Sequence, residues 1–142
     1  MVRGGAVPAG PTGYFRLSLA PMTCSGPAYP VESYALPCQS AEMVRLWLFD
    51  ATGRLTTTLH ETGEHNRVAI PLPALARSLA LTGAAYVFMA HNHPSGDPRP
   101  SDADIEATRQ VWRVARMLGA SLQDHIVIAE DRWFSFRSHG LL

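Results

Sequence analysis

The chain contains no lysine and only two cysteines, and both absences limit the functions it can have. Its 12 basic residues are all arginines and balance 12 acidic residues, so the net charge is zero. No arginine cluster stands out, whereas a domain that binds nucleic acid by itself normally carries a basic excess on some element. Direct nucleic-acid binding is therefore not expected. Cys24 and Cys38 have no CxxC partner, which excludes a zinc site built from thiolates.

Long hydrophobic runs are absent as well. The longest uninterrupted apolar stretch, residues 84–90, is too short to cross a bilayer. Proline and glycine interrupt the residues that follow Arg3, so the apolar core of a signal peptide is missing. We therefore expect a cytoplasmic protein with no membrane partner. A chain of 142 residues, 46% of them hydrophobic, is long enough to bury a sizeable core.

Composition divides the chain in two. The first 38 residues contain six of the 11 prolines and five of the 11 glycines, which indicates a Pro/Gly-rich N-terminal arm over residues 1–40. Within this arm only residues 14–19 alternate weakly, as a short strand would. Residues 41–142 have the hydrophobic patterns of regular elements and are predicted to form one domain.

The patterns within residues 41–142 predict an α/β fold, with a mixed β-sheet flanked by helices. Residues 43–50 and 55–61 are β-rich and flank a turn at Gly53, which is typical of a hairpin. Pro71 and Pro73 precede an expected helix that Gly83 would end. The other expected elements are strands at 67–70, 84–90, 122–129 and 133–137, and a helix at 102–118 with Ile105, Val111, Val114, Ala115 and Leu118 on one apolar stripe.

The stretch "HNHPSGDPRPSDAD", residues 91–104, lies where a central strand is expected to end and a helix to begin. His91 and His93 are two apart, which places both imidazoles on one side of an extended segment. Asp104 stands in the first turn of the helix and can turn back toward them. Two imidazoles and a carboxylate are a common ligand set for catalytic zinc. Ser101-x-x-Asp104 is also close to a capping box, which needs no metal, and spacing alone leaves both interpretations open.

Two other interpretations of this stretch fail on spacing. A zinc deaminase requires H-x-E followed by P-C-x-x-C, and the chain has no such cysteine pair. In HNH nucleases the three residues lie on separate elements, whereas here they are contiguous.

The order His91-x-His93, seven residues, Ser101, two residues, Asp104 resembles the signature of the JAMM, or MPN+, metalloisopeptidases. More narrowly, "AHNHPSGDPRPSDADIEATR" is similar to the RadC family, a bacterial branch of that fold. The resemblance extends upstream to "AEMVRLWLFDATGRL" and downstream to "LGASLQDHIVIAEDRWFSFRSHGLL". It implies the MPN/JAB fold, with a cytidine-deaminase-like architecture. RadC proteins usually carry a helix-hairpin-helix region before this domain, and the 40 preceding residues show no helical period, so a stand-alone copy is expected.

The resemblance also implies roles for individual residues. Zn²⁺ would be held by His91, His93 and Asp104. Glu42, which precedes the first strand as the family requires, would act as general base. The Ser101 hydroxyl would stabilise an oxyanion. Without the family, Glu42 would be interpreted as a surface acid at the edge of a strand.

The sequence therefore predicts a zinc-dependent hydrolase of peptide or isopeptide bonds, with a protein or peptide substrate. Two alternatives remain: an accessory protein in DNA repair of the RadC type, and a metal-stabilised protein-binding module without turnover. Asp124 and His125 recur in the resemblance as neighbours of the site or as a structural pair on a buried strand, and the structural pair is favoured. Leu141-Leu142 and exposed aromatic residues leave room for a homodimer.

Overall fold

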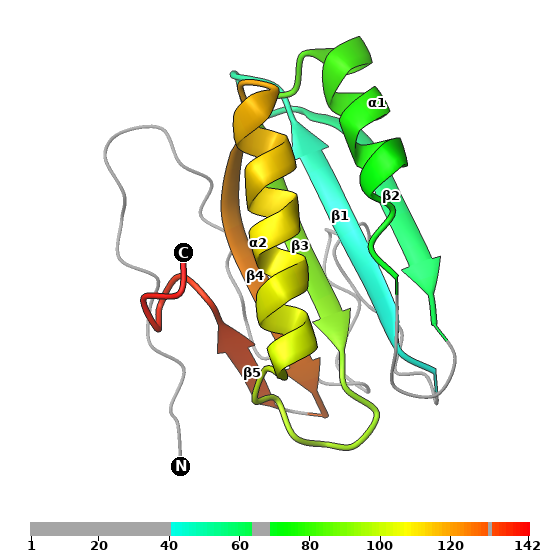
Figure 1. The fold of residues 1–142 in the computed structure, drawn as a ribbon, viewed down its shortest axis with the longest axis vertical. Coiled ribbons are helices and arrows are strands. Elements are labelled where there is room, and N and C mark those ends of the chain that lie inside the picture. Colours follow the sequence, from blue (N-terminus) through cyan, green and yellow to red (C-terminus); the bar gives the residue numbers. More distant parts are fainter. Residues whose placement is uncertain (1–40, 64–68, 131) are drawn as a thin grey trace.

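The computed structural model describes residues 41–63, 69–130 and 132–142, which form a five-stranded sheet and two helices (Figure 1). The elements are β1 (Met43–Phe49), β2 (Leu55–Thr62), α1 (Leu72–Thr82), β3 (Tyr86–Asn92), α2 (Asp102–Met117), β4 (Ser121–Ala129) and β5 (Arg132–Ser135).

The sheet is mixed, with β3 at its centre. The strand order is β2-β1-β3-β4-β5. β1 runs antiparallel to both β2 and β3, whereas β3 and β4 are parallel and are connected through α2. β4 and β5 close the sheet as an antiparallel pair. This confirms the predicted α/β fold with a mixed sheet and two helices.

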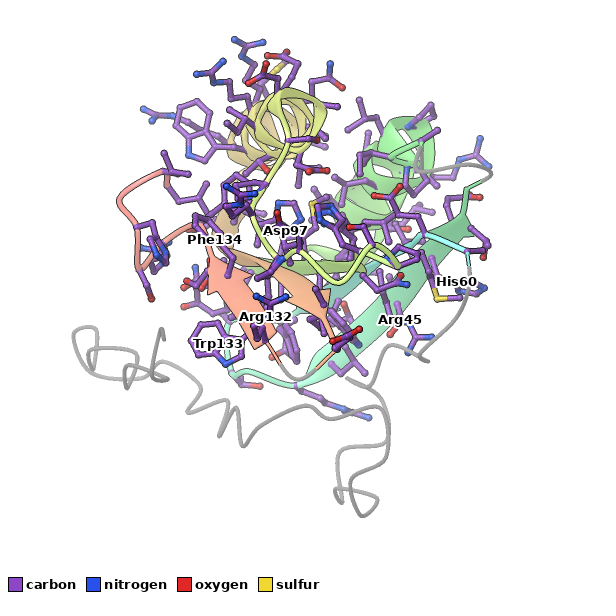
Figure 2. The ribbon with its side chains drawn as sticks, turned by 90° about the horizontal axis from the view of Figure 1, so that it is seen from below. Arg45, His60, Asp97, Arg132, Trp133 and Phe134 are labelled. Carbon is purple, nitrogen blue, oxygen red and sulfur yellow. The ribbon has the colours of Figure 1, made fainter. Side chains whose placement is uncertain are left out.

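Both helices cover the same face of the sheet, as Figure 2 shows in a view turned from that of Figure 1. Alternation along the strands assigns side chains to the two faces. On the helix face, Val44, Leu46 and Leu48 of β1 pack with Leu75 of α1 and Val111 of α2 in the larger core. The opposite face carries a second apolar cluster, which comprises Trp47, Phe49, Ala90, Ile126 and Ile128.

The helix ends follow local chemistry. Gly83 has φ +63° and ends α1, because its N–H reaches the Leu79 carbonyl in a left-handed conformation that glycine adopts without strain. α1 begins at Leu72 and contains Pro73 in its first turn. The helix therefore starts earlier than expected, since the sequence placed Pro73 before it. At the start of α2, Ser101 and Asp104 form the predicted capping box.

Several predictions need correction. Ala69 and Ile70 lie outside any strand, so the expected strand at 67–70 is wrong for these two residues; residues 67 and 68 are outside the described part. Leu118 caps α2 and is 42% exposed, so it does not belong to the buried stripe. The expectations for residues 1–40, including the short strand at 14–19, also fall outside the described part. Neither described helix is long and apolar enough to span a membrane.

Candidate metal centre

Alternation along two neighbouring strands brings the candidate residues together on the helix face. In β1 the even-numbered residues from Val44 to Leu48 face the helices, so Glu42, just before the strand, points the same way. In β3, Val87 and Met89 face the helices, and His91 continues this series. The antiparallel pairing of Val44 with His91 then sets Glu42 beside the end of β3.

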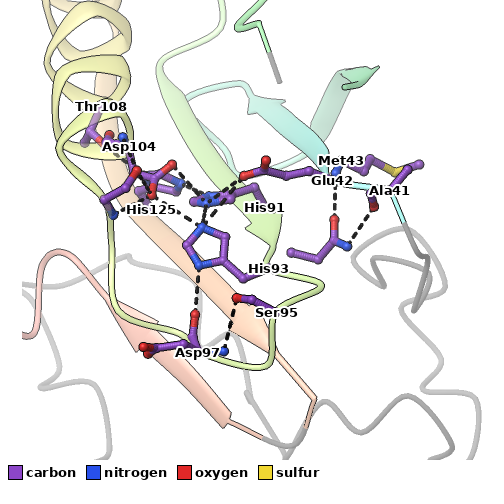
Figure 3. Close-up of polar contacts among 12 residues, drawn as sticks. Ala41, Glu42, Met43, His91, His93, Ser95, Asp97, Asp104, Thr108 and His125 are labelled. Carbon is purple, nitrogen blue, oxygen red and sulfur yellow. Dashed lines mark hydrogen bonds and ion pairs between the residues drawn. The ribbon is translucent and has the colours of Figure 1, made fainter. Parts of the chain in front are cut away.

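Four side chains converge at this point, as Figure 3 shows from the start of β1, the end of β3 and the first turn of α2. Glu42, His91, His93 and Asp104 each offer one ligand atom, and these atoms lie within 4.8 Å of one another. Glu42 and His91 are buried, and the other two are partly buried. The structure thus brings together all three residues predicted as metal ligands and the residue predicted as general base.

The spacing of the ligand atoms suits a small divalent cation. The Nε2 atoms of His91 and His93 are 2.8 Å apart. Asp104 places Oδ1 at 3.2 Å from Nε2 of His91 and Oδ2 at 3.4 Å from Nε2 of His93. A tetrahedral zinc ion with bonds of about 2.0–2.1 Å separates its ligand atoms by roughly 3.3 Å. The three residues therefore fit a zinc ion with little rearrangement.

The loop after β3 fixes the protonation of His93. Its Nδ1 lies 2.8 Å from the backbone carbonyl of Asp97, which can only accept, so Nδ1 carries the proton. The neutral ring then presents the Nε2 lone pair to the centre. When the ring takes up a second proton on Nε2, that N–H faces the Asp104 carboxylate, and this interaction raises the pKa of His93 despite its partial burial. The Asp97 carboxylate points elsewhere and pairs with the exposed Arg99, so it is no ligand.

A contact from the last strand supports this loop. Arg132 of β5 donates a hydrogen bond to the Gly96 carbonyl, and Figure 2 shows Arg132 near Asp97 at this end of the molecule. Gly96 has a backbone φ of +80°, a left-handed conformation that glycine adopts without strain.

Asp104 caps α2 and faces the metal centre at the same time. Its Oδ2 accepts hydrogen bonds from the backbone N–H and the hydroxyl of Ser101, each at 2.6 Å. Its Oδ1 is directed to His91. Burial works to raise the pKa of Asp104, but the His91 and His93 rings, which donate from Nε2 when protonated, outweigh it and hold the pKa far below its ordinary value. The capping box and a ligand role are therefore compatible in one residue.

Glu42 differs from the three predicted ligand residues in its position and its bonding. Its Oε1 lies 3.8 and 3.7 Å from the Nε2 atoms of His91 and His93, farther than any spacing among the three ligand residues. Glu42 is 5% exposed, and its Oε2 has no hydrogen-bond partner among the described residues. Burial raises its pKa, against the opposing effect of the two histidines. An unpaired buried carboxylate oxygen at this place is available to accept a proton.

Asn92 holds the backbone on both sides of Glu42. Its Oδ1 accepts a hydrogen bond of 2.7 Å from the N–H of Met43, and its Nδ2 donates to the carbonyl of Ala41 at 3.1 Å. From the sequence alone, Asn92 suits two roles equally, orienting a neighbouring loop or ligand and forming a turn. These two hydrogen bonds tie the segment that carries Glu42 to the strand that carries His91.

Ser101 lies at the open side of the centre. Together with Glu42, His93, Pro94 and Ser95 it lines a pocket that reaches two of the four converging side chains, Glu42 and His93. Its hydroxyl proton is directed to Asp104. Donation to a substrate oxygen would require the hydroxyl to rotate away from that carboxylate.

Asp124 and His125 have different roles. Asp124 is structural: it accepts hydrogen bonds from the Ser135 hydroxyl and from the backbone N–H groups of His125 and Arg137. His125, however, lies 2.7 Å from Nδ1 of His91, so the favoured view of a purely structural pair is wrong for His125. Burial lowers the pKa of His125 well below its ordinary value. Thr108 of α2, which the sequence analysis missed, contacts the other nitrogen of His125.

The chain is similar to a known protein family and to several bacterial proteins. A family model described as RadC-like JAB domain matches residues 24–141. A UPF0758 protein of Rhodobacter capsulatus is 49% identical over 72 residues, which cover 51% of this chain and 33% of that relative. UPF0758 proteins of Trichlorobacter lovleyi and Syntrophomonas wolfei are 36% and 33% identical over 103 residues; each match covers 71% of this chain, and 44% and 43% of the relatives. The chain spans less than half the length of these relatives.

Proposed function

The chain belongs to the RadC-like JAB domain family, and on this premise we propose that it is a zinc-dependent hydrolase of peptide or isopeptide bonds. The observation that carries the proposal is the cluster of two histidines and Asp104 with Glu42 beside it, whose Oε2 is buried and unpaired among the described residues. The substrate proposed is a protein or peptide, because a pocket with a general base and a cation site suits attack on an amide carbonyl.

His91, His93 and Asp104 would hold the ion. Nitrogen and carboxylate ligands in this number leave a coordination position free, as in catalytic rather than structural zinc sites. Zinc bound there would activate a water molecule and polarise the carbonyl of the substrate.

Glu42 would accept the proton of the attacking water and return it to the leaving amine. Its burial favours the protonated form, which suits a group that must both take and release a proton. Because Glu42 lies outside the ligand set, it is expected to matter for turnover and not for metal affinity. The Ser101 hydroxyl, at the wall of the pocket, would donate to the developing oxyanion.

The two alternative functions explain fewer features of the site. A protein-binding module stabilised by metal needs no buried carboxylate with a free oxygen, and structural zinc sites usually fill all four positions with protein ligands. A role as a DNA-repair accessory has no support in the net charge of zero. The name UPF0758 assigns no activity to the relatives.

The test compares metal content with turnover in the full chain. Wild type, His93→Ala, Glu42→Gln and the control Glu61→Gln, an exposed acid on β2, are analysed for zinc by mass spectrometry and assayed on a quenched fluorescent peptide library. Wild type, Glu42→Gln and Glu61→Gln should carry about one zinc per chain, and His93→Ala should lose it.

Turnover separates the roles further. Glu42→Gln should lower the cleavage rate by about 10²–10⁴-fold, whereas Glu61→Gln should cleave like wild type. A wild-type protein that takes up no added zinc would refute the proposal. Cleavage at the wild-type rate by Glu42→Gln would refute the role of Glu42.

A further inference from the structure

A chain of hydrogen bonds leads from the metal centre into the interior of the domain. His91 Nδ1 lies 2.7 Å from His125 Nε2, and His125 Nδ1 lies 2.7 Å from the hydroxyl oxygen of Thr108. That hydroxyl in turn donates to the backbone carbonyl of Asp104 at 2.6 Å. The chain thus begins at one metal ligand and ends on the backbone of another (Figure 3).

The direction of each bond follows from the last one. Two oxygens 2.6 Å apart need a proton between them, and a carbonyl cannot supply it, so the Thr108 hydroxyl gives its only proton to Asp104. Thr108 can then only accept from His125, which must carry its proton on Nδ1. The Nε2 atom of the neutral His125 ring has a lone pair and accepts from Nδ1 of His91. His91 is left with its own lone pair on Nε2, toward the metal centre.

We propose that Thr108 and His125 are positioning residues that hold His91 in the Nδ1–H tautomer, so that its Nε2 is ready to bind the cation. The proposal rests on the metal centre of the proposed function. Ligand histidines usually donate their second N–H to a carboxylate, a carbonyl or water, and this contact fixes both tautomer and ring orientation. His93 uses the carbonyl of Asp97 for this purpose, and His91 uses a second imidazole.

The surroundings of His125 suit this task. The side chain is fully buried, both ring nitrogens are engaged, and the ring stacks on Phe136 with centroids 4.5 Å apart and an interplanar angle of 18°. Phe136 is held in place by its N–H, which donates to the His125 carbonyl, and by the turn that Asp124 fixes through Ser135. The ring of His125 therefore has a single orientation within the described structure.

Charge explains why an imidazole suits this position. The cluster already contains the carboxyl groups of Glu42 and Asp104. A carboxylate in place of His125 would bury a third acidic group beside His91. A neutral imidazole, itself anchored by a hydroxyl, orients His91 without that charge.

The tests use Thr108→Val, which has a similar shape but lacks the hydroxyl, and Thr108→Ser, which retains it. In metal-free wild type, ¹⁵N–¹H spectra of the imidazoles should show His125 protonated on Nδ1. Zinc affinity, measured by competition with a chelator, should fall about 10–100-fold in Thr108→Val and return to the wild-type value in Thr108→Ser. His93 serves as the control within each spectrum, because the Asp97 carbonyl fixes its tautomer in every variant.

Two results would overturn the proposal: His125 protonated on Nε2 in the wild type, or a folded Thr108→Val that binds zinc as tightly as wild type. Results that would refute the proposed hydrolase function differ from these two. If the wild type binds zinc and cleaves no peptide, the hydrolase proposal fails and the affinities still decide the positioning role. If the wild type takes up no zinc, both proposals fail, because His91 then has no cation to bind.

Discussion

Replacement of Asn92 by alanine should separate the placement of Glu42 from metal binding. The side chain makes two hydrogen bonds, one to each side of Glu42. Asn92→Ala leaves the buried N–H of Met43 without its partner, at a cost of about 1–3 kcal/mol, and removes a second bond worth about 0.5–1.5 kcal/mol. The free energy of unfolding should therefore fall by roughly 2–4 kcal/mol.

The effect on turnover should exceed the effect on metal content. Without the two bonds, the segment that carries Glu42 is free to shift relative to β3, and a displacement near 1 Å can lower the rate by about 10²-fold. Zinc content should stay near one ion per chain, since none of the three proposed ligands depends on Asn92. Urea unfolding, zinc analysis and peptide cleavage are measured on the same preparation. Gln123→Ala, which also removes a side-chain amide but makes only a 3.5 Å contact to a nearby carbonyl, serves as the control.

Asn92→Ala that cleaved peptide at the wild-type rate while unfolding at a lower urea concentration would refute a role of Asn92 in catalysis. That result would show that Asn92 stabilises the strand pair without placing Glu42. Loss of zinc from this variant would also contradict the argument, because it would make Asn92 necessary for the ligands themselves.

Three further predictions concern pH, backbone strain and the hydrogen bonds that Asp124 makes to β5 and to the turn after it. In the metal-free protein the pKa of His93 is raised above its ordinary 6.5. The pairing of protonated His93 with Asp104 therefore stabilises the fold below pH 6.5, and this stabilisation is lost as the pH rises through the raised pKa. NMR titration should show a lower pKa for His93 in Asp104→Asn. Gly96→Ala should lower the stability by about 1–2 kcal/mol in thermal unfolding, because φ is +80° and the new Cβ would lie 3.3 Å from Glu130 Oε1; an unchanged melting temperature would contradict this. Asp124→Ala leaves the buried N–H of its neighbour unpaired and removes two other hydrogen bonds, so urea unfolding should show a loss of about 2–4 kcal/mol, and an unchanged midpoint would refute that role.

Hydrophobic periodicity was sufficient to predict most elements and the mixed sheet, and the similarity to the RadC family is confirmed. Periodicity placed the central strand at residues 84–90, two residues earlier than β3 (Tyr86–Asn92). Apolar character stops at Ala90, but β3 continues through His91 and Asn92 because backbone pairing with β4 does not depend on polarity.

The surroundings of the site were harder to predict than its candidate ligand residues. His91, His93 and Asp104 are close in sequence, so spacing alone could suggest them. Thr108 and His125 meet only because α2 packs on β4, and nothing in the local sequence of either indicates the other. A threonine inside a helix and a histidine on an apolar strand each suit several structural roles, so their connection to His91 requires three-dimensional information.

The candidate metal centre combines Glu42 with three residues from a distant part of the chain, so its four side chains meet only in the folded state. An ion that binds it favours folding by mass action. Above the dissociation constant, each tenfold increase in free zinc should add about 1.4 kcal/mol to the free energy of unfolding. The thermal midpoint of this domain should then follow zinc availability in its surroundings, and a zinc-poor medium should expose more of the protein to proteolysis through its larger unfolded fraction.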